Sequence, residues 1–409
     1  MPAIPRFQAP LSFAEMREAW LANQHGAHEP WPEFARQFTR YLGTPYAVPT
    51  PSGRAGLAAL LYAFDFPPGS EVIVPALTFH SVPAAVTQAG LRPRFVDIDP
   101  STCCLDPAGL EAAVNPSTRA VIATHLYGRA CDMERIARLA AEHGWKVIED
   151  CAQSCGGGYR GRRLGSLGDA AYFSFGPTKN LSALWAGMIT ADSEPLIRRA
   201  AEWLSRLPRI STMALARRAI FALGMRGATQ SLIWRGLMFP ALKLFARFKI
   251  DPIEALTEET PQAEPGSDRP AYWMPGPFQG AVAQSQLAKL DHENGLRIRN
   301  GKLLRQLLEG TPGLQIPAAA PEGENIFMSF PVHVADRDRF RRRLLHLGVD
   351  TASGYMSACH TLPQYQPQAA AAPCALEAIP RMVHLPVYPA LTSEQIEWIA
   401  QAVRTALTQ

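Results

Sequence analysis

Residues 147–181, VIEDCAQSCGGGYRGRRLGSLGDAAYFSFGPTKNL, contain two apolar runs that each lead to an ionisable side chain. The first run ends in Asp150, and a carboxylate is costly there unless a cation or a hydrogen-bond donor meets it. The second run leads to Lys179, which is either a surface lysine with a buried stem or an amine whose charge has been given up to chemistry. The surrounding sequence has to distinguish these two possibilities.

The chain before this stretch alternates between helical and strand patterns. Hydrophobic spacing and turn residues predict helices at 52–66, 82–90, 105–114 and 132–144, and strands at 71–79, 92–99, 118–128 and 145–154. Strands separated by helices of this length imply parallel pairing and an α/β sheet with helices on both faces. Because ligands collect at the carboxyl ends of such strands, we expect Phe79, His125, Asp150 and the Lys179 loop to lie near one another.

Three features at these strand ends point to one cofactor. Ser52, Gly53 and Arg54 start a predicted helix, where free backbone N–H groups and the helix dipole hold an anion such as phosphate. Asp150 supplies a buried carboxylate, and apolar surroundings would lower the pKa of Lys179 and make it nucleophilic. A phosphate cradle, a carboxylate and a desolvated lysine are the needs of pyridoxal phosphate.

The composition of the chain excludes several other classes of protein. With 409 residues and 47% apolar residues, the chain can bury a large core, and a net charge of +4 gives no case for nucleic-acid binding. Seven cysteines without paired zinc-type spacing favour free thiols, and we expect no metal site. No signal-peptide pattern and no apolar run of roughly 18 residues is present. These observations predict a cytoplasmic protein.

Six blocks occur in an order that resembles a known family. They are SGRAGLAAL, EVIVPALTFHS, FVDIDP, HLYG, the stretch from 147 to 181 and LPVYPALTSEQ. In this order they are similar to the blocks of the DegT/DnrJ/EryC1/StrS aminotransferases, which use pyridoxal phosphate to aminate keto-sugars attached to nucleotides. The resemblance implies the fold-type I architecture, with a large domain built on a mostly parallel sheet flanked by helices and a smaller C-terminal α/β domain.

The same resemblance implies roles for individual residues. Lys179 would form the Schiff base with the cofactor and shuttle the proton, Asp150 would contact the pyridine nitrogen, and Gln153 would lie beside the ring oxygen. The remaining cofactor contacts would come from Ser52, Gly53, Arg54, Ser174 and Phe79, with Phe79 stacked on the ring. Glutamate would be the amino donor and a ketone the acceptor. A homodimer with shared active sites is implied as well.

The substrate side departs from the family pattern. Arg54 stands where the family usually has threonine, and the glycine-rich segment after the lysine is replaced by LWAG, which contains Trp185. The asparagine that usually reaches the phosphate of the partner subunit has no obvious counterpart. Candidate substrate contacts, given as weaker assignments, are Trp185, His125, Tyr355 and His360. His125, Tyr355 and His360 can equally be structural.

An apparent insertion at 203–270 is the largest departure. From Trp203 to Ile250 there are nine Lys or Arg and no acidic residue, and apolar groups lie between the basic ones. This composition is typical of basic amphipathic helices on anionic membrane surfaces. It also fits helices that pack on the domain or on a dimer partner and expose their basic residues to solvent, or a surface that binds a nucleotide or a nucleic acid. Residues 257–270 are acidic and proline-rich and predict an exposed connector.

The sequence predicts a boundary between a large cofactor-binding domain, residues 1–285, and a small domain, residues 286–409. Within the small domain, strands are predicted at 325–334 and 349–355, and helices at 337–348 and 393–407. In fold-type I enzymes such a lobe covers the active site.

Other functions stay open. A dehydratase on the same fold is disfavoured because the relatives with that activity replace the lysine with histidine. A regulator that keeps the cofactor pocket as a sensor is possible on sequence grounds, as is a membrane-surface protein that uses the insertion. The acceptor is a keto-sugar in the first interpretation, and a lipid-linked or non-sugar ketone at the inner face of the membrane in the alternative.

Overall fold

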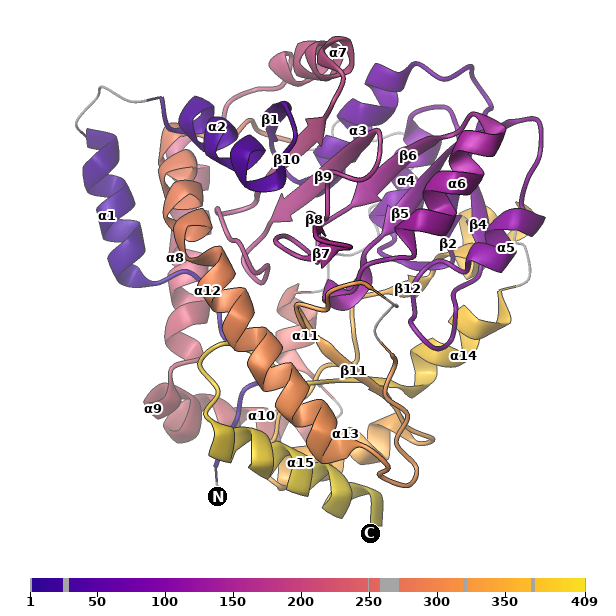
Figure 1. Ribbon diagram of the computed structural model, residues 1–409. Coiled ribbons are helices and arrows are strands. Elements are labelled where there is room, and N and C mark those ends of the chain that lie inside the picture. The colour runs from indigo at the N-terminus through magenta and orange to yellow at the C-terminus, as the bar shows by residue number, and fades with distance from the viewer. Residues whose placement is uncertain are drawn as a thin grey trace.

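The computed structural model describes residues 2–24, 29–248, 250–257, 272–318, 322–368 and 372–408 and is built around a seven-stranded sheet (Figure 1). The strand order is β1-β10-β9-β6-β5-β2-β4. The strands are β1 (Tyr46–Thr50), β2 (Glu71–Pro75), β4 (Arg92–Val96), β5 (Thr118–Thr124), β6 (Lys146–Asp150), β9 (Ala170–Phe175) and β10 (Ala186–Ala191). Only β10 runs against its neighbours in this sheet. The predicted mostly parallel α/β sheet is confirmed.

Both faces of the sheet are covered by helices, which explains its nearly continuous apolar strands. On β2, Val72 and Val74 belong to one hydrophobic cluster and Ile73 to the other. The first cluster includes side chains of α3 (Gly53–Phe64), α4 (Ser81–Gln88) and α7 (Glu194–Ser205). The second includes side chains of α2 (Pro30–Leu42), α5 (Pro107–Ala112), α6 (Met133–His143) and α12 (Pro277–Leu308).

Local signals in the sequence mark the start of α5 and the end of α6. The Asp106 carboxylate accepts hydrogen bonds from the backbone N–H groups of Ala108 and Gly109 at the start of α5. Gly144 ends α6 with a φ of 68°, a left-handed conformation that glycine adopts without steric cost. Both helices are crossovers, α5 between β4 and β5 and α6 between β5 and β6.

The C-terminal lobe has its own hydrophobic core. It contains β11 (Phe330–His333), α13 (Arg337–His346), β13 (Met382–Leu385), α15 (Ser393–Thr408) and the second half of α12. Ile4, from the start of the chain, is buried in the same core. The proposed boundary at 285/286 falls inside α12, which runs along both parts of the molecule (Figure 1).

The predicted strand at 349–355 is wrong. Ala352 makes only an isolated bridge with His384, and β11 pairs instead with β13, which the sequence reading did not predict. The chain turns at Gly354, where φ is 97° and a Cβ atom would lie 2.7 Å from the Nε2 of His384. The turn leads into β12 (Ser357–Ala358), which pairs with β3 (Leu77–Thr78) beside the large sheet. Residues 353–356 therefore cross from one part of the molecule to the other instead of extending a strand.

Most of the insertion that the structure describes is helical, as its composition predicted. It forms α8 (Thr212–Ala228), α9 (Ser231–Ile233), a π-helical turn η2 (Trp234–Met238), α10 (Phe239–Ala246) and α11 (Pro252–Thr257). Ala222 of α8 shares a core with Met16 of α1 (Phe13–Gln24) and Val282 of α12. Packing on the rest of the chain therefore accounts for one face of α8. The predicted connector lies almost wholly outside the described residues, and among those that are described no helix is long and apolar enough to cross a bilayer.

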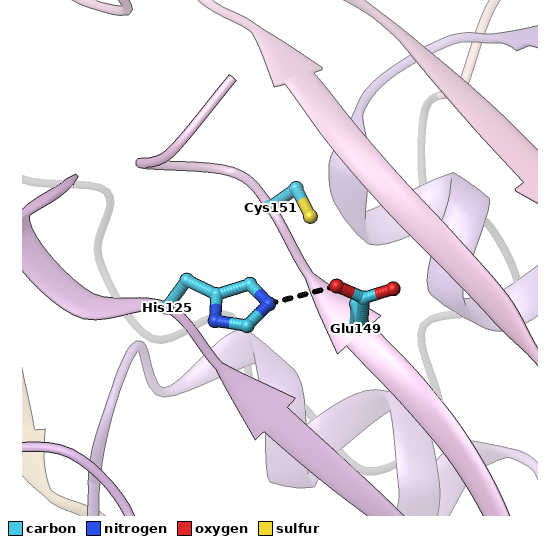
Figure 2. A group of neighbouring side chains, drawn as sticks. All are labelled: His125, Glu149 and Cys151. Atoms are coloured by element: carbon cyan, nitrogen blue, oxygen red, sulfur yellow. Dashed lines mark hydrogen bonds and ion pairs between the residues drawn. The ribbon is translucent and has the colours of Figure 1, made fainter. Parts of the chain in front are cut away.

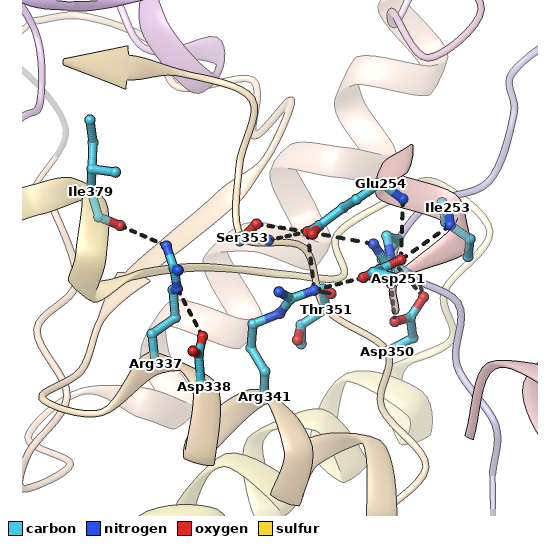
Figure 3. Close-up of polar contacts among 11 residues, drawn as sticks. Asp251, Ile253, Glu254, Arg337, Asp338, Arg341, Asp350, Thr351, Ser353 and Ile379 are labelled. Carbon is cyan, nitrogen blue, oxygen red and sulfur yellow. Dashed lines mark hydrogen bonds and ion pairs between the residues drawn. The ribbon is translucent and has the colours of Figure 1, made fainter. Parts of the chain in front are cut away.

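An ion-pair network holds the end of the insertion against the C-terminal lobe (Figure 3). Asp251 caps α11 through the backbone N–H groups of Ile253 and Glu254, and it also binds Arg6 at 2.8 Å and Arg341 at 2.9 Å. Burial alone would raise the pKa of Asp251, but the charges and hydrogen bonds of these two arginines lower it. Asp251 is thus held as a carboxylate that joins three distant segments.

Gly187 of β10 lets the turn before α3 lie close to the sheet. A Cβ atom at this position would lie 2.5 Å from the carbonyl oxygen of Phe173 and 2.7 Å from the Oγ1 of Thr50. Both distances are too short for any side chain. The β1–α3 turn, which carries Ser52, can therefore approach β9 only across a glycine.

We expect Gly187→Ala to lower the free energy of unfolding by about 2 kcal/mol, because the new methyl group overpacks a rigid backbone. Gly224→Ala is the matched control, since Gly224 lies inside α8 and a Cβ atom there meets nothing within 4 Å. The control should raise stability by up to about 1 kcal/mol. Urea unfolding of the three proteins measures both changes, and an unchanged midpoint for Gly187→Ala would contradict the assignment.

Candidate active site

A cavity of about 380 Å³ lies at the carboxyl ends of the parallel strands. It is lined by every residue that the sequence singled out except His360, namely Ser52, Gly53, Arg54, Phe79, His125, Asp150, Gln153, Ser174, Lys179, Trp185 and Tyr355. The residues that we expected to lie together at the strand ends therefore surround one cavity. His360 is buried and packs near Phe95, with ring centroids 6.3 Å apart, and it is not among the residues that line the cavity.

Asp150 is the last residue of β6 and is 5% exposed. Its Oδ1 accepts a hydrogen bond from the backbone N–H of Ala152 at 3.0 Å. Burial raises the pKa of Asp150, while that hydrogen bond and the charge of Lys179 act in the opposite direction. A buried carboxylate of this kind favours a cationic hydrogen-bond donor inside the cavity.

Lys179 lies on the loop between β9 and β10, and the next residue fixes that loop. The side-chain amide of Asn180 donates to the carbonyl oxygen of Cys155 at 2.6 Å and to the Oδ1 of Asn294 at 3.1 Å. Asn294 also donates to the carbonyl oxygen of Cys155, at 3.1 Å. Because Asn180 is buried between α12 and the turn after β6, the lysine side chain leaves a backbone with little freedom to move.

The start of α3 forms an anion cradle opposite this loop. Ser52 is the N-cap, and its Oγ accepts a hydrogen bond from the backbone N–H of Ala55. A Cβ atom at Gly53 would lie 3.1 Å from the Cβ of Ser174, so the first turn of the helix and the serine of β9 are in close contact. The first turn of α3, the Ser174 hydroxyl and the positive end of the helix dipole therefore meet at one place, with the Arg54 side chain beside them.

Gln153 presents a donor to the cavity. Its Oε1 accepts a hydrogen bond from the backbone N–H of Tyr127 at 2.9 Å, and its Nε2 lies 4.0 Å from the sulfur of Met356. The amide oxygen is thus engaged, which leaves the NH₂ group for a ligand.

Phe79 follows β3 and lies against His80, with ring centroids 4.3 Å apart.

Behind the cavity, His125 and Glu149 form a buried pair (Figure 2). The backbone N–H of Cys131 donates to the Nδ1 of His125, so Nε2 carries the hydrogen and donates to Glu149 at 3.0 Å. Burial would raise the pKa of Glu149, but His125 and the backbone N–H groups of Gly165 and Gly168 lower it. This pair fixes the orientation of the imidazole ring.

The three donor atoms of His125, Glu149 and Cys151 lie within 4.8 Å of one another, close enough to be tested as metal ligands. However, the Glu149 oxygens already accept hydrogen bonds from His125 and from the backbone N–H groups of residues 165, 167 and 168. Burial also raises the pKa of the Cys151 thiol well above its usual range, which disfavours the thiolate that a metal needs. The arrangement is that of a hydrogen-bonded support.

The substrate side of the cavity contains residues that sequence reasoning missed. Phe221 of α8 lines the cavity and packs against Trp185, with ring centroids 5.4 Å apart. Arg218, one turn earlier on α8, lies 5.9 Å from the centre of the Trp185 ring and donates to the carbonyl oxygen of Leu184 at 3.3 Å. Leu184 and Trp185 both have positive φ values, 56° and 64°, which are strained for residues with a side chain. The contacts of α8 therefore hold two strained residues in place.

Glu254 brings a second part of the insertion to the cavity. Its carboxylate accepts hydrogen bonds from Arg341 at 3.0 Å and from the backbone N–H and hydroxyl of Ser353 at 2.7 and 2.8 Å (Figure 3). Ser353 precedes Gly354 and Tyr355, which also line the cavity. No sequence motif marks Phe221 or Glu254. Tyr172, another lining residue, could have been predicted, because it lies two residues before Ser174 on β9 and therefore faces the same side of the sheet.

These residues fit pyridoxal phosphate. Thr78 and Thr124 line the cavity with buried hydroxyl groups that have no hydrogen-bond partner within the described part of the chain. The cradle at Gly53 suits a phosphate, and the buried Asp150 suits a protonated pyridine nitrogen. The donor set therefore matches the cofactor at both ends, with Lys179 on the same cavity.

Comparison with known proteins gives the same assignment. The DegT/DnrJ/EryC1/StrS aminotransferase family model matches residues 12–214 and 276–404, which leaves out most of the insertion. The chain is 30% identical to dTDP-3-amino-3,4,6-trideoxy-alpha-D-glucose transaminase of Streptomyces venezuelae over 98% of this chain and 96% of that protein. It is 31% identical to UDP-N-acetyl-3-dehydro-alpha-D-glucosamine 3-aminotransferase of Acidithiobacillus ferrooxidans over 89% of this chain and 85% of that protein.

Two further similarities extend this result. The chain is 34% identical to L-glutamine:2-deoxy-scyllo-inosose aminotransferase of Streptoalloteichus tenebrarius over 70% of this chain, but it spans only 58% of that protein. The crystal structure of DesV from S. venezuelae with a ketimine intermediate superposes with a TM-score of 0.77 at 27% identity, covering 99% of this chain and 98% of that one. The chain therefore belongs to the DegT/DnrJ/EryC1/StrS family of pyridoxal phosphate-dependent aminotransferases.

Proposed function

We propose that the protein transfers an amino group from an amino acid, with glutamate as the first choice, to a keto-sugar attached to a nucleotide. The observation that carries the proposal is the single cavity that combines Asp150, Lys179 and the N-terminus of α3. The S. venezuelae and A. ferrooxidans relatives, which are named for dTDP- and UDP-linked sugars, support this acceptor class. The product would serve the biosynthesis of a polysaccharide, a glycolipid or a natural product.

Each side chain has a defined task in this proposal. Pyridoxal phosphate, when bound, supplies an electron sink for the carbon that loses its proton. Lys179 holds the cofactor and, once the donor amine has displaced it, takes the proton from the donor and later returns one to the acceptor. Asp150 keeps a proton on the pyridine nitrogen, and Gln153 donates to the ring oxygen.

The remaining contacts orient the cofactor and the substrate. Ser52, Gly53, Arg54 and Ser174 are proposed to hold the phosphate, because they surround the N-terminus of α3. Phe79 is proposed to stack on the ring. Tyr355 and Trp185 would approach the substrate. Substrate contact by His125 and His360 is a weaker proposal, because both ring nitrogens of His125 are already hydrogen-bonded and His360 is not among the residues that line the cavity.

We also propose a cytoplasmic homodimer with shared active sites. The adjacent helices α1 and α8 expose large apolar side chains that support a partner surface, among them Phe13 and Trp20 on α1 and Met213 and Ile220 on α8. The seven cysteines are all free thiols, which supports a reducing compartment. Peripheral contact of residues 203–250 with the inner face of the membrane is part of the same proposal.

The first test is an absorbance titration with pyridoxal phosphate, followed by addition of glutamate. The wild type should gain near-visible absorbance and lose it with glutamate as the cofactor accepts the amino group. Lys179→Ala should lack that absorbance, because its side chain has no amine to bond the cofactor. Lys302→Ala, a change at an exposed lysine of α12, is the matched control and should behave as the wild type does.

The same spectra distinguish the alternatives. Cofactor binding without any response to glutamate, other amino acids or keto-sugars would favour a regulator that only senses the cofactor. Near-visible absorbance in Lys179→Ala equal to that of the wild type would overturn the role of the lysine.

Asp150→Asn should lower the rate of the glutamate half-reaction by roughly a hundredfold or more, because it removes the charge that favours a protonated pyridine nitrogen. Asp169→Asn is the control, since Asp169 pairs with Lys146 at the other end of β6, away from the cavity. Stopped-flow absorbance measures the rate directly. Equal rates for Asp150→Asn and the wild type would exclude this role.

Phe221→Ala should raise the KM for the keto-sugar by about fivefold, since an aromatic contact with the substrate contributes on the order of 1 kcal/mol. The rate with glutamate should change by less than about twofold. Leu376→Ala changes an apolar residue that is 48% exposed and is not among the residues that line the cavity, and it should leave both values unchanged. A similar KM for all three proteins would show that α8 does not contact the acceptor.

A further inference from the structure

The insertion exposes an apolar surface that the active site does not use. We call it the α9–α10 face and define it by large side chains with at least two-fifths of their surface exposed: Leu232, Ile233, Leu237, Leu244, Phe245, Phe248 and Ile250. Leu232 is 87% exposed, Phe248 69% and Leu237 65%. In Figure 1, α9 and α10 lie at the lower edge of the molecule, away from the central sheet. So many large apolar side chains on one short segment mark a contact surface.

The opposite side of the same segment is firmly packed. Trp234, Phe239 and Leu242 form a buried cluster with Leu345 of α13. The π-helical turn, in which the N–H of Phe239 donates to the carbonyl oxygen of Trp234, brings residues five apart onto the same buried side. The segment is therefore a fixed amphipathic element whose outer face is apolar.

The segment that carries this face is basic. No acidic residue occurs between Trp203 and Ile250, and Arg235 and Arg247 are exposed beside the apolar side chains. The next acids along the chain, Asp251 and Glu254, are paired with Arg6 and Arg341. They cannot neutralise the basic residues of the face.

We propose that the α9–α10 face docks on a membrane that contains anionic lipids. Apolar side chains would enter the boundary between headgroups and acyl chains while the basic residues meet lipid phosphates, the geometry of an interfacial amphipathic helix. A second copy of the chain is a poorer partner, because the same face on two copies would bring two basic segments together. This inference identifies the partner of the peripheral contact in the proposed function, but binding to vesicles does not depend on the reaction.

The insertion also forms part of the cavity wall through Phe221 and Glu254. Its two ends therefore reach the substrate site while its middle reaches the membrane. An enzyme held in this way would be placed beside the pool of membrane-attached acceptors or products of its own reaction.

Co-sedimentation of the cofactor-loaded full chain with vesicles tests the proposal. The probes are vesicles of phosphatidylcholine with phosphatidylglycerol and vesicles of phosphatidylcholine alone. Binding should occur with the first, be much weaker with the second and fall as sodium chloride is raised. Leu237→Glu with Phe248→Glu should weaken binding by about tenfold or more, because both apolar anchors are lost. Leu376→Glu, on α14 (Pro373–Arg381) and 48% exposed, is the matched control and should bind as the wild type does.

A second variant tests charge without touching the apolar side chains. Arg235→Gln with Arg247→Gln should weaken binding roughly fivefold for each basic residue removed. Near-visible cofactor absorbance and thermal melting confirm that each variant is folded. Equal sedimentation with both kinds of vesicle, or no loss of binding in either double variant, would overturn the proposal. A third result would also overturn the proposal. If the wild type forms assemblies larger than a dimer, does not bind vesicles, and loses those assemblies in the Glu variants, then the partner of the face is protein.

Discussion

The pairing of β6 with β9 is the constraint on which the site depends. Its parallel register places Asp150 opposite Tyr172. Tyr172 precedes Ser174 by two residues and Lys179 by seven. Because successive side chains of a strand point to opposite faces, Asp150 faces the cavity while Glu149 faces away from it and binds His125. A shift of one residue in this pairing would turn Asp150 away from the cavity and separate Glu149 from His125.

Two sets of buried hydrogen bonds hold the site in position. Glu149 holds the imidazole of His125 and, through backbone N–H groups, the loop that precedes β9. Asn180 fixes the loop of Lys179 to α12 and to the turn after β6. Such buried, fully hydrogen-bonded contacts keep reactive groups in position without moving parts. Buried hydrogen bonds thus hold the side of the cavity that carries Asp150 and Lys179.

On the proposed substrate side of the cavity, residues of the insertion form part of the wall and support Trp185. Trp185 stands in a left-handed conformation that is costly for a bulky residue, and Arg218 and Phe221 of α8 pack against its ring. Glu254 reaches the cavity from α11, where Asp251 and Arg341 anchor it. The same segment thus shapes the substrate wall and exposes the α9–α10 face. The proposed contact with the acceptor and the proposed docking on a membrane thus both involve the insertion.

The sequence by itself determined the alternating strands and helices of the sheet and most of the residues at the strand ends that line the cavity, because each depends on local spacing or on a contiguous motif. Only the tertiary structure decided that β11 pairs with β13 and not with residues 349–355. It also decided that Phe221 and Glu254 reach the cavity and that His360 is not among its lining residues. The physical reason is that these outcomes depend on contacts between segments far apart in the chain, and neither composition nor periodicity records which distant surfaces will meet.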